Sequence, residues 1–191
     1  MNKSRMEAFS DGVMAVLITI LVLELKVPHG GDWHALQPVL PVFCTYVLSF
    51  IFLGIYWSNH HHLLHTTTRV TGAILWANLH LLFWLSLVPF TTGWMGEYPL
   101  ELVPTVAYGV VLFFAGIGYL ILQTAIIADQ GKEGRLAQAL GRDTKGNLSG
   151  ALYAVAVACA FYRPWISLGI YVGVALLWLV PDRRIESRFR E

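Results

Sequence analysis

The sequence predicts an all-α membrane protein with six transmembrane helices. Hydrophobic residues make up 56% of the 191 residues and charged residues only 13%, which is too apolar for an ordinary soluble domain. The apolar residues fall into stretches of about the 17 to 25 residues that a helix needs to cross a bilayer core of about 30 Å. We expect a single domain, 1–191, with spans at about 9–27, 38–60, 72–93, 102–126, 147–162 and 165–181.

The composition argues against several other classes of protein. The formal net charge is only +1, so nothing indicates a nucleic-acid partner. Cys44 and Cys159 lie far apart in apolar stretches and lack CxxC or histidine spacing, so neither a disulfide nor a metal site is expected there. We expect no catalytic residue, no bound metal and no cofactor.

The first span, 9–27, follows a basic N-terminus. Asp11 interrupts the start of its apolar run and no small-x-small cleavage site follows Glu24, which predicts a retained membrane helix rather than a signal peptide. Asp11 lies about a turn and a half after Arg5, so an ion pair between the two is within reach. At the other end, Glu24 could concentrate cations or pair with Lys26.

Histidines gather where the second span ends, at His60, His61, His62 and His65. His61 and His65 are one helical turn apart, the spacing that two imidazoles need to share a zinc ion. A membrane metalloenzyme using the His60–His65 cluster is therefore an alternative, although no HExxH or second HxxxH element supplies a third ligand or a general base. We favour interfacial histidines that form hydrogen bonds, one of them with Ser10 or Asp11.

The fourth span contains the run Gly116-Ile117-Gly118-Tyr119, similar to the carbonyl filter of ordinary potassium channels. Such a filter needs an extended loop that re-enters the membrane beside a pore helix. These residues instead lie inside an unbroken apolar stretch. We therefore expect Gly109, Gly116 and Gly118 to let helices approach closely.

The last two spans are short and meet at Arg163-Pro164, where a helix does not continue cleanly because proline lacks a backbone donor. A single kinked span, and hence five helices in all, is the alternative. Six spans place most Lys and Arg on one side of the membrane, which makes both termini cytoplasmic by the positive-inside rule. That side holds Lys3, Arg5, Arg69, Lys132, Arg135, Arg142, Lys145, Arg183, Arg184, Arg188 and Arg190. Only Lys26 and Arg163 lie opposite. The longest polar segment, 128–146, is expected to be a loop with at most one surface helix.

The first span resembles a known family. Arg5 with Phe9-Ser10-Asp11, followed by GVMAVLITILVLEL, is similar to the opening helix of the lysosomal potassium channels with the FSD motif and their prokaryotic relatives, the transmembrane-protein-175-like channels. Trp57-x-x-His60 at the end of the second span resembles a later motif of the family. Asn78 with the Pro89-Phe90 ending of the third span resembles another.

The resemblance implies a homotetramer in which the first helix of each copy lines a central pore. It implies that the Phe-Ser-Asp motif holds this helix in place, while an apolar constriction and a threonine layer shape the ion path. Carried onto this chain, the lining residues are Val16, Thr19, Ile20 and Leu23, and the motif network is Arg5, Phe9, Ser10, Asp11, Trp57, His60 and Asn78. Val16 is smaller than the isoleucine or leucine expected at the constriction.

We therefore expect a potassium-permeable channel that conducts passively, in the inner membrane of a prokaryote, with the bilayer, potassium and other monovalent cations as partners. A secondary transporter is the main alternative. It should show inverted repeats and Gly or Pro breaks in helices near the middle of the membrane, and neither is clear in this sequence.

Overall fold

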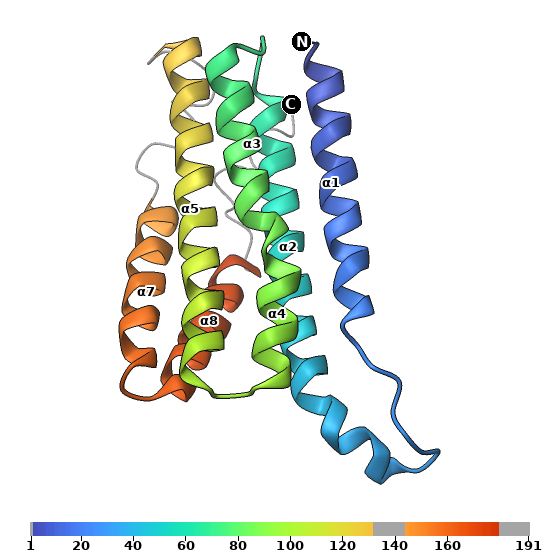
Figure 1. Cartoon of the computed structure of the whole chain (residues 1–191). Coiled ribbons are helices and arrows are strands. Elements are labelled where there is room, and N and C mark those ends of the chain that lie inside the picture. Colours follow the sequence, from blue (N-terminus) through green and yellow to red (C-terminus); the bar gives the residue numbers. More distant parts are fainter. Residues whose placement is uncertain (1, 132–143, 180–191) are drawn as a thin grey trace.

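The computed structural model describes residues 2–131 and 144–179 of the chain. Every regular element in these ranges is a helix (Figure 1). The elements are α1 (Lys3–Leu23), the 3₁₀ helix η1 (Trp33–Val39), α2 (Leu40–His65), α3 (Gly72–Ser86), α4 (Val88–Glu97), α5 (Leu102–Gln130), α7 (Thr144–Ala160) and α8 (Pro164–Leu179). The all-α prediction is confirmed.

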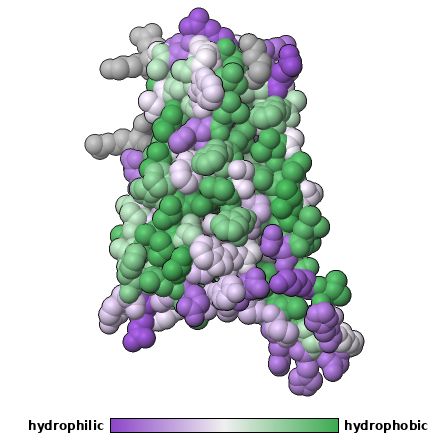
Figure 2. All heavy atoms as spheres, viewed as in Figure 1, coloured by the Kyte–Doolittle hydropathy of each residue, from purple (hydrophilic) through white to green (hydrophobic). Residues whose placement is uncertain are grey.

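Four described segments are long and apolar enough to cross a membrane: Lys3–Leu23, Trp33–His65, Gly72–Glu97 and Leu102–Gln130. The third segment consists of α3 and α4, which stack almost end to end. They are separated at Leu87 because Pro89 stands at the start of α4, where its missing N–H and fixed φ angle are tolerated. Hydrophobic side chains cover the middle of the molecule in Figure 2, with hydrophilic ones at both ends.

The last two helices form a hairpin. α7 ends at Ala160, the N–H of Arg163 donates to the carbonyl of Cys159 (2.8 Å), and α8 begins at Pro164. Because the two helices turn back on each other, a single kinked span is excluded. In Figure 1 the hairpin runs beside only the first half of α5. The second half of α5 is not covered by α7 or α8.

The bundle has two polar ends. The start of α1, the end of α2, the start of α3 and the end of α5 lie at the same end in Figure 1, which carries Lys3 and Arg69. Lys26 and Arg163 lie at the opposite end. The other basic residues on which the orientation was predicted, apart from Arg5 and Lys145, fall in 132–143 or 180–191, outside the described residues, as does most of the predicted loop 128–146.

Close packing in the bundle depends on glycine. A Cβ atom added at Gly118 would lie 3.0 Å from the Cα of Leu81, so the small residue lets α5 approach the backbone of α3. Gly109 in the same way makes room for the Tyr171 ring of α8. The run Gly116-Ile117-Gly118-Tyr119 is regular helix within α5, as expected, and so cannot present its carbonyls as an extended filter.

Candidate ion pathway along helix α1

Helix α1 has one face packed against the bundle and one face left open. The buried face consists of Met6, Ser10, Met14, Leu17 and Leu21, which follow one another at intervals of three or four residues. Their side chains contact the other helices of the chain, and α1 stands at the edge of the bundle in Figure 1. The exposed residues on the opposite side of α1 therefore face whatever surrounds the chain.

The four lining residues predicted from the sequence lie on this open face. Val16 is 54% exposed, Ile20 37% and Leu23 77%, and Thr19 is exposed beside them. The spacing i, i+3, i+4 and i+7 places them on one stripe of the helix. No other part of the described chain covers the stripe, so it is available to lipid or to another copy of the protein.

Thr19 is the only polar residue of the stripe. Its hydroxyl donates to the carbonyl of Val16, with an O–O distance of 2.8 Å. A hydroxyl has one donor and two lone pairs, so a hydroxyl whose proton is used inside the helix still offers oxygen lone pairs to its surroundings. The stripe thus carries a single layer of oxygen acceptors, at Thr19, among apolar side chains.

A chain of hydrogen bonds joins the buried face of α1 to the two helices beside it. The hydroxyl of Ser10 donates to the carbonyl of Met6 (2.9 Å) and accepts from the amide Nδ2 of Asn78 (3.0 Å) on α3. The Oδ1 atom of Asn78 lies 2.7 Å from Nε2 of His60 on α2. Since an amide oxygen only accepts, Nε2 carries the proton and donates. The side chains of Ser10, Asn78 and His60 are fully buried.

Asp11 makes a second link between α1 and α2. Its Oδ1 accepts from the indole Nε1 of Trp57 at 3.1 Å, at an exposed position. Among the described residues there is no ion pair between Asp11 and Arg5, although their spacing would allow one. Arg5 is exposed, and Phe9 is half exposed on the open side of α1.

The histidines diverge instead of gathering around a common point. His60 points toward Asn78, while Nδ1 of His62 pairs with the carbonyl of Ser58 at 2.8 Å. His61 and His65 have ring centroids 6.4 Å apart. No group of three or more potential ligand side chains that could hold a metal occurs in the described part of the chain. Of the histidines, only His60 is linked to Ser10, and it is linked through Asn78.

Contacts at both ends of α1 were not predicted. At one end, Lys3 donates to the carbonyl of His65 at 2.8 Å. At the other, Lys26 pairs with Glu97 at 3.5 Å and not with Glu24, whose carboxylate lies against Gly93 of α4. The topology could have suggested these contacts, because the predicted spans place the partners at the same side of the membrane.

Arg69 and Asp129 join the loop before α3 to the end of α5. The Nε atom of Arg69 lies 2.9 and 3.1 Å from the two carboxylate oxygens, and Nη2 lies 2.8 Å from Oδ1. These hydrogen bonds, together with the negative charge of Asp129, raise the pKa of the Arg69 guanidinium. Close by, Gln130 donates to the carbonyl of Thr66 at 2.6 Å. The end of the bundle where α5 finishes is therefore held together by polar contacts that were not predicted from the sequence.

Comparison with known proteins places this arrangement among channels. The family model of the endosomal/lysosomal potassium channel TMEM175 matches residues 5–89. A potassium channel of Chryseobacterium sp. is 50% identical over 191 residues, which is 100% of each chain. A potassium channel of Chamaesiphon minutus is 33% identical over 188 residues, covering 90% of this chain and 91% of the relative.

A solved structure is similar over nearly the whole chain. The crystal structure of a lysosomal potassium-selective channel TMEM175 homolog from Chamaesiphon minutus superposes with a TM-score of 0.79 and 28% identity, covering 93% of this chain and 96% of the other. The proteins found are named as channels and not as enzymes, which agrees with the expectation that the chain is not an enzyme. Together with its apolar spans, this similarity identifies a multi-pass membrane protein.

We expect the Asn78→Ala variant to be less stable by about 1–3 kcal/mol, because the buried donor of His60 loses its acceptor and Ser10 loses its donor. The measurement is the free energy of unfolding of the purified protein, from titration with a denaturing detergent. Ser86→Ala is the matched control on the same helix, since the Ser86 hydroxyl is exposed and donates only to the carbonyl of Phe83. Equal stability of the two variants would contradict the importance of the buried chain.

Proposed function

The chain belongs to the TMEM175 potassium channel family, and we propose on that basis that it is a potassium-permeable channel which conducts passively. We propose further that four copies assemble around a central pore lined by α1. The observation that carries this proposal is the open face of α1, an apolar stripe with one threonine that the rest of the chain leaves uncovered.

The stripe has the chemistry of a narrow, gated cation path. In a ring of four copies, Val16, Ile20 and Leu23 would form apolar layers, and such layers can close a pore by losing their water. Thr19 would form a ring of hydroxyl oxygens between them. Because its proton is donated to the carbonyl of Val16, each hydroxyl presents lone pairs that can replace part of the hydration shell of a potassium ion.

The buried hydrogen bonds supply the rigidity that such a path needs. Ser10, Asn78 and His60 fix the rotation of α1 about its own axis, because each group has a directional partner on another helix. Trp57 and Asp11 add a second attachment at nearly the same level of the helix. We propose that this network, with Phe9 and Arg5 at the helix start, keeps the stripe turned toward the pore.

The proposed location is the inner membrane of a prokaryote, with both chain termini in the cytoplasm. Lys3 and Arg69 at the end of the bundle where α1 begins support this orientation, since basic residues are enriched in cytoplasmic loops. The proposed partners are other copies of the chain, the surrounding lipid and monovalent cations, with potassium as the permeant ion and no cofactor.

Reconstitution of the purified protein in planar bilayers, with opposed potassium and sodium gradients, tests the function. We expect single-channel steps and a reversal potential displaced toward the potassium equilibrium value. A secondary transporter would instead give slow flux coupled to a second ion and no unitary steps. Coupled flux of this kind would refute the channel. The absence of any current in repeated preparations that retain the fold would also refute it.

Replacing Thr19 by alanine should reduce the preference for potassium over sodium, because the oxygen ring is lost while the apolar layers stay. The measurement is the reversal potential under the same opposed gradients. Thr124→Ala is the matched control, because Thr124 is also exposed and donates to a carbonyl of its own helix, that of Leu120, but lies on α5. An unchanged reversal potential in Thr19→Ala would remove this residue from the selective part of the path.

A further inference from the structure

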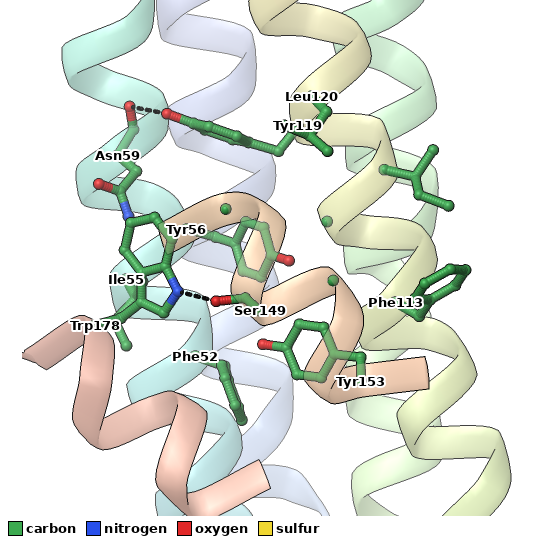
Figure 3. Close-up of a pocket in the computed structure, with 14 residues that line it drawn as sticks. Phe52, Ile55, Tyr56, Asn59, Phe113, Tyr119, Leu120, Ser149, Tyr153 and Trp178 are labelled. Carbon is green, nitrogen blue, oxygen red and sulfur yellow. Dashed lines mark hydrogen bonds between the residues drawn. The ribbon is translucent and has the colours of Figure 1, made fainter. Parts of the chain in front are cut away.

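A groove lies between α2, α5, α7 and α8, away from the open face of α1 (Figure 3). The room inside it for a water-sized sphere is about 70 Å³, and the groove is partly open at its surface. Its walls are largely aromatic and aliphatic, and they include Phe52 and Tyr56 of α2, Phe113 and Gly116 of α5, Tyr153 of α7 and Trp178 of α8. None of these residues takes part in the hydrogen-bond network that holds α1.

The groove lies at the depth of the hydrocarbon layer. Gly116 is the central residue of α5, with fourteen residues on either side, so it lies about 21 Å from each end of the helix at 1.5 Å per residue. Asn59 lies at the same rim of the groove as Tyr119, toward the end of α2 (Figure 3). It precedes the end of α2 at His65 by six residues, or about 9 Å. The groove therefore extends from the middle of the bilayer toward the polar interface at the end where α2 finishes.

Three polar side chains in the groove have no hydrogen-bond partner within residues 2–131 and 144–179: the hydroxyls of Tyr56 and Tyr153 and the amide of Asn59. Other polar groups there are paired. The indole of Trp178 donates to the hydroxyl of Ser149 at 2.8 Å, and the Tyr119 hydroxyl donates to the carbonyl of Asn59 at 3.3 Å. An unpaired hydroxyl in an apolar setting costs roughly 1–3 kcal/mol, so an acceptor brought by a ligand would be favourable.

We propose that the groove binds one acyl chain of a bilayer phospholipid, whose ester carbonyl accepts hydrogen bonds from Tyr56 and Asn59. The apolar walls suit the acyl chain. The two donors are three residues apart on α2 and so share one side of the helix. They also lie between the middle of the bilayer and the polar interface, on the side from which an ester group approaches. At this depth, lipid is the molecule in greatest supply.

Glycines in the wall allow the groove to be filled by mutation. A Cβ atom at Gly116 would have the Tyr56 hydroxyl as its nearest neighbour, at 3.8 Å, which is ordinary contact. At Gly150 nothing lies within 4 Å. Leucine at either position should therefore occupy groove volume without displacing backbone. Gly173 on α8 is the matched control, because its surroundings are also open and it does not line the groove.

The test uses the full chain in liposomes that contain a trace of phosphatidylethanolamine with a photoactivatable diazirine in its acyl chain. Peptide mass spectrometry after illumination maps the labelled residues. We expect labelling to concentrate on Phe113 and Tyr153, above that of Trp76 and Phe83, which are exposed on α3. Gly116→Leu and Gly150→Leu should each lower the groove labelling about tenfold, equivalent to ~1.4 kcal/mol of binding free energy.

The control and one further variant keep this test decisive. Gly173→Leu should label like the unmodified chain, and Tyr56→Phe should lose labelling several-fold without any change in groove volume. If Gly116→Leu does not fold, as judged by its melting temperature, Gly150→Leu takes its place. Equal groove labelling in the filled and control variants overturns the proposal. Labelling of the groove no stronger than that of Trp76 also overturns the proposal, because the groove would then be empty or filled by the chain itself.

Discussion

The buried hydrogen bonds from Ser10 through Asn78 to His60 are the interaction on which the proposed pore depends. In a bilayer, apolar side chains gain little by leaving lipid for one another, so apolar contacts alone hold a helix weakly and at no particular rotation. Hydrogen bonds between helices are directional, and no water competes for them in the hydrocarbon layer. The chain in this protein links three helices through side chains that are fully buried.

Fixing one face of α1 determines what the opposite face can do. With Ser10 turned toward α3, the stripe of Val16, Thr19, Ile20 and Leu23 is turned outward. The other helices then act as a frame. α3 and α5 pack closely where Gly118 meets Leu81, and the end of the bundle where α5 finishes is held by the ion pair of Arg69 with Asp129. In the proposed channel, the side chains that line the ion path therefore lie on α1, and the other helices support this helix.

The sequence was sufficient to predict the helices, but not to predict most of the contacts between them. Apolar runs of membrane length gave their approximate positions, and the residues of the Phe-Ser-Asp motif indicated which helix carries special polar groups. The partner of Asp11 could not be predicted, because Arg5 is near in sequence whereas Trp57 becomes near only when α1 and α2 pack. The level of the α7–α8 hairpin in the bundle was also not predictable, since composition indicates that a segment is apolar but not its depth.

Water access to Ile20 is the most direct test of the claim that the open face of α1 lines the ion path. Cysteine would replace Ile20 in a chain whose Cys44 and Cys159 are changed to alanine, and a positively charged methanethiosulfonate reagent would be added during recording. We predict that the current falls irreversibly, whereas cysteine at the buried Met14 leaves it unchanged. Full current after modification of Ile20→Cys, with labelling of the thiol verified by mass, would contradict the account.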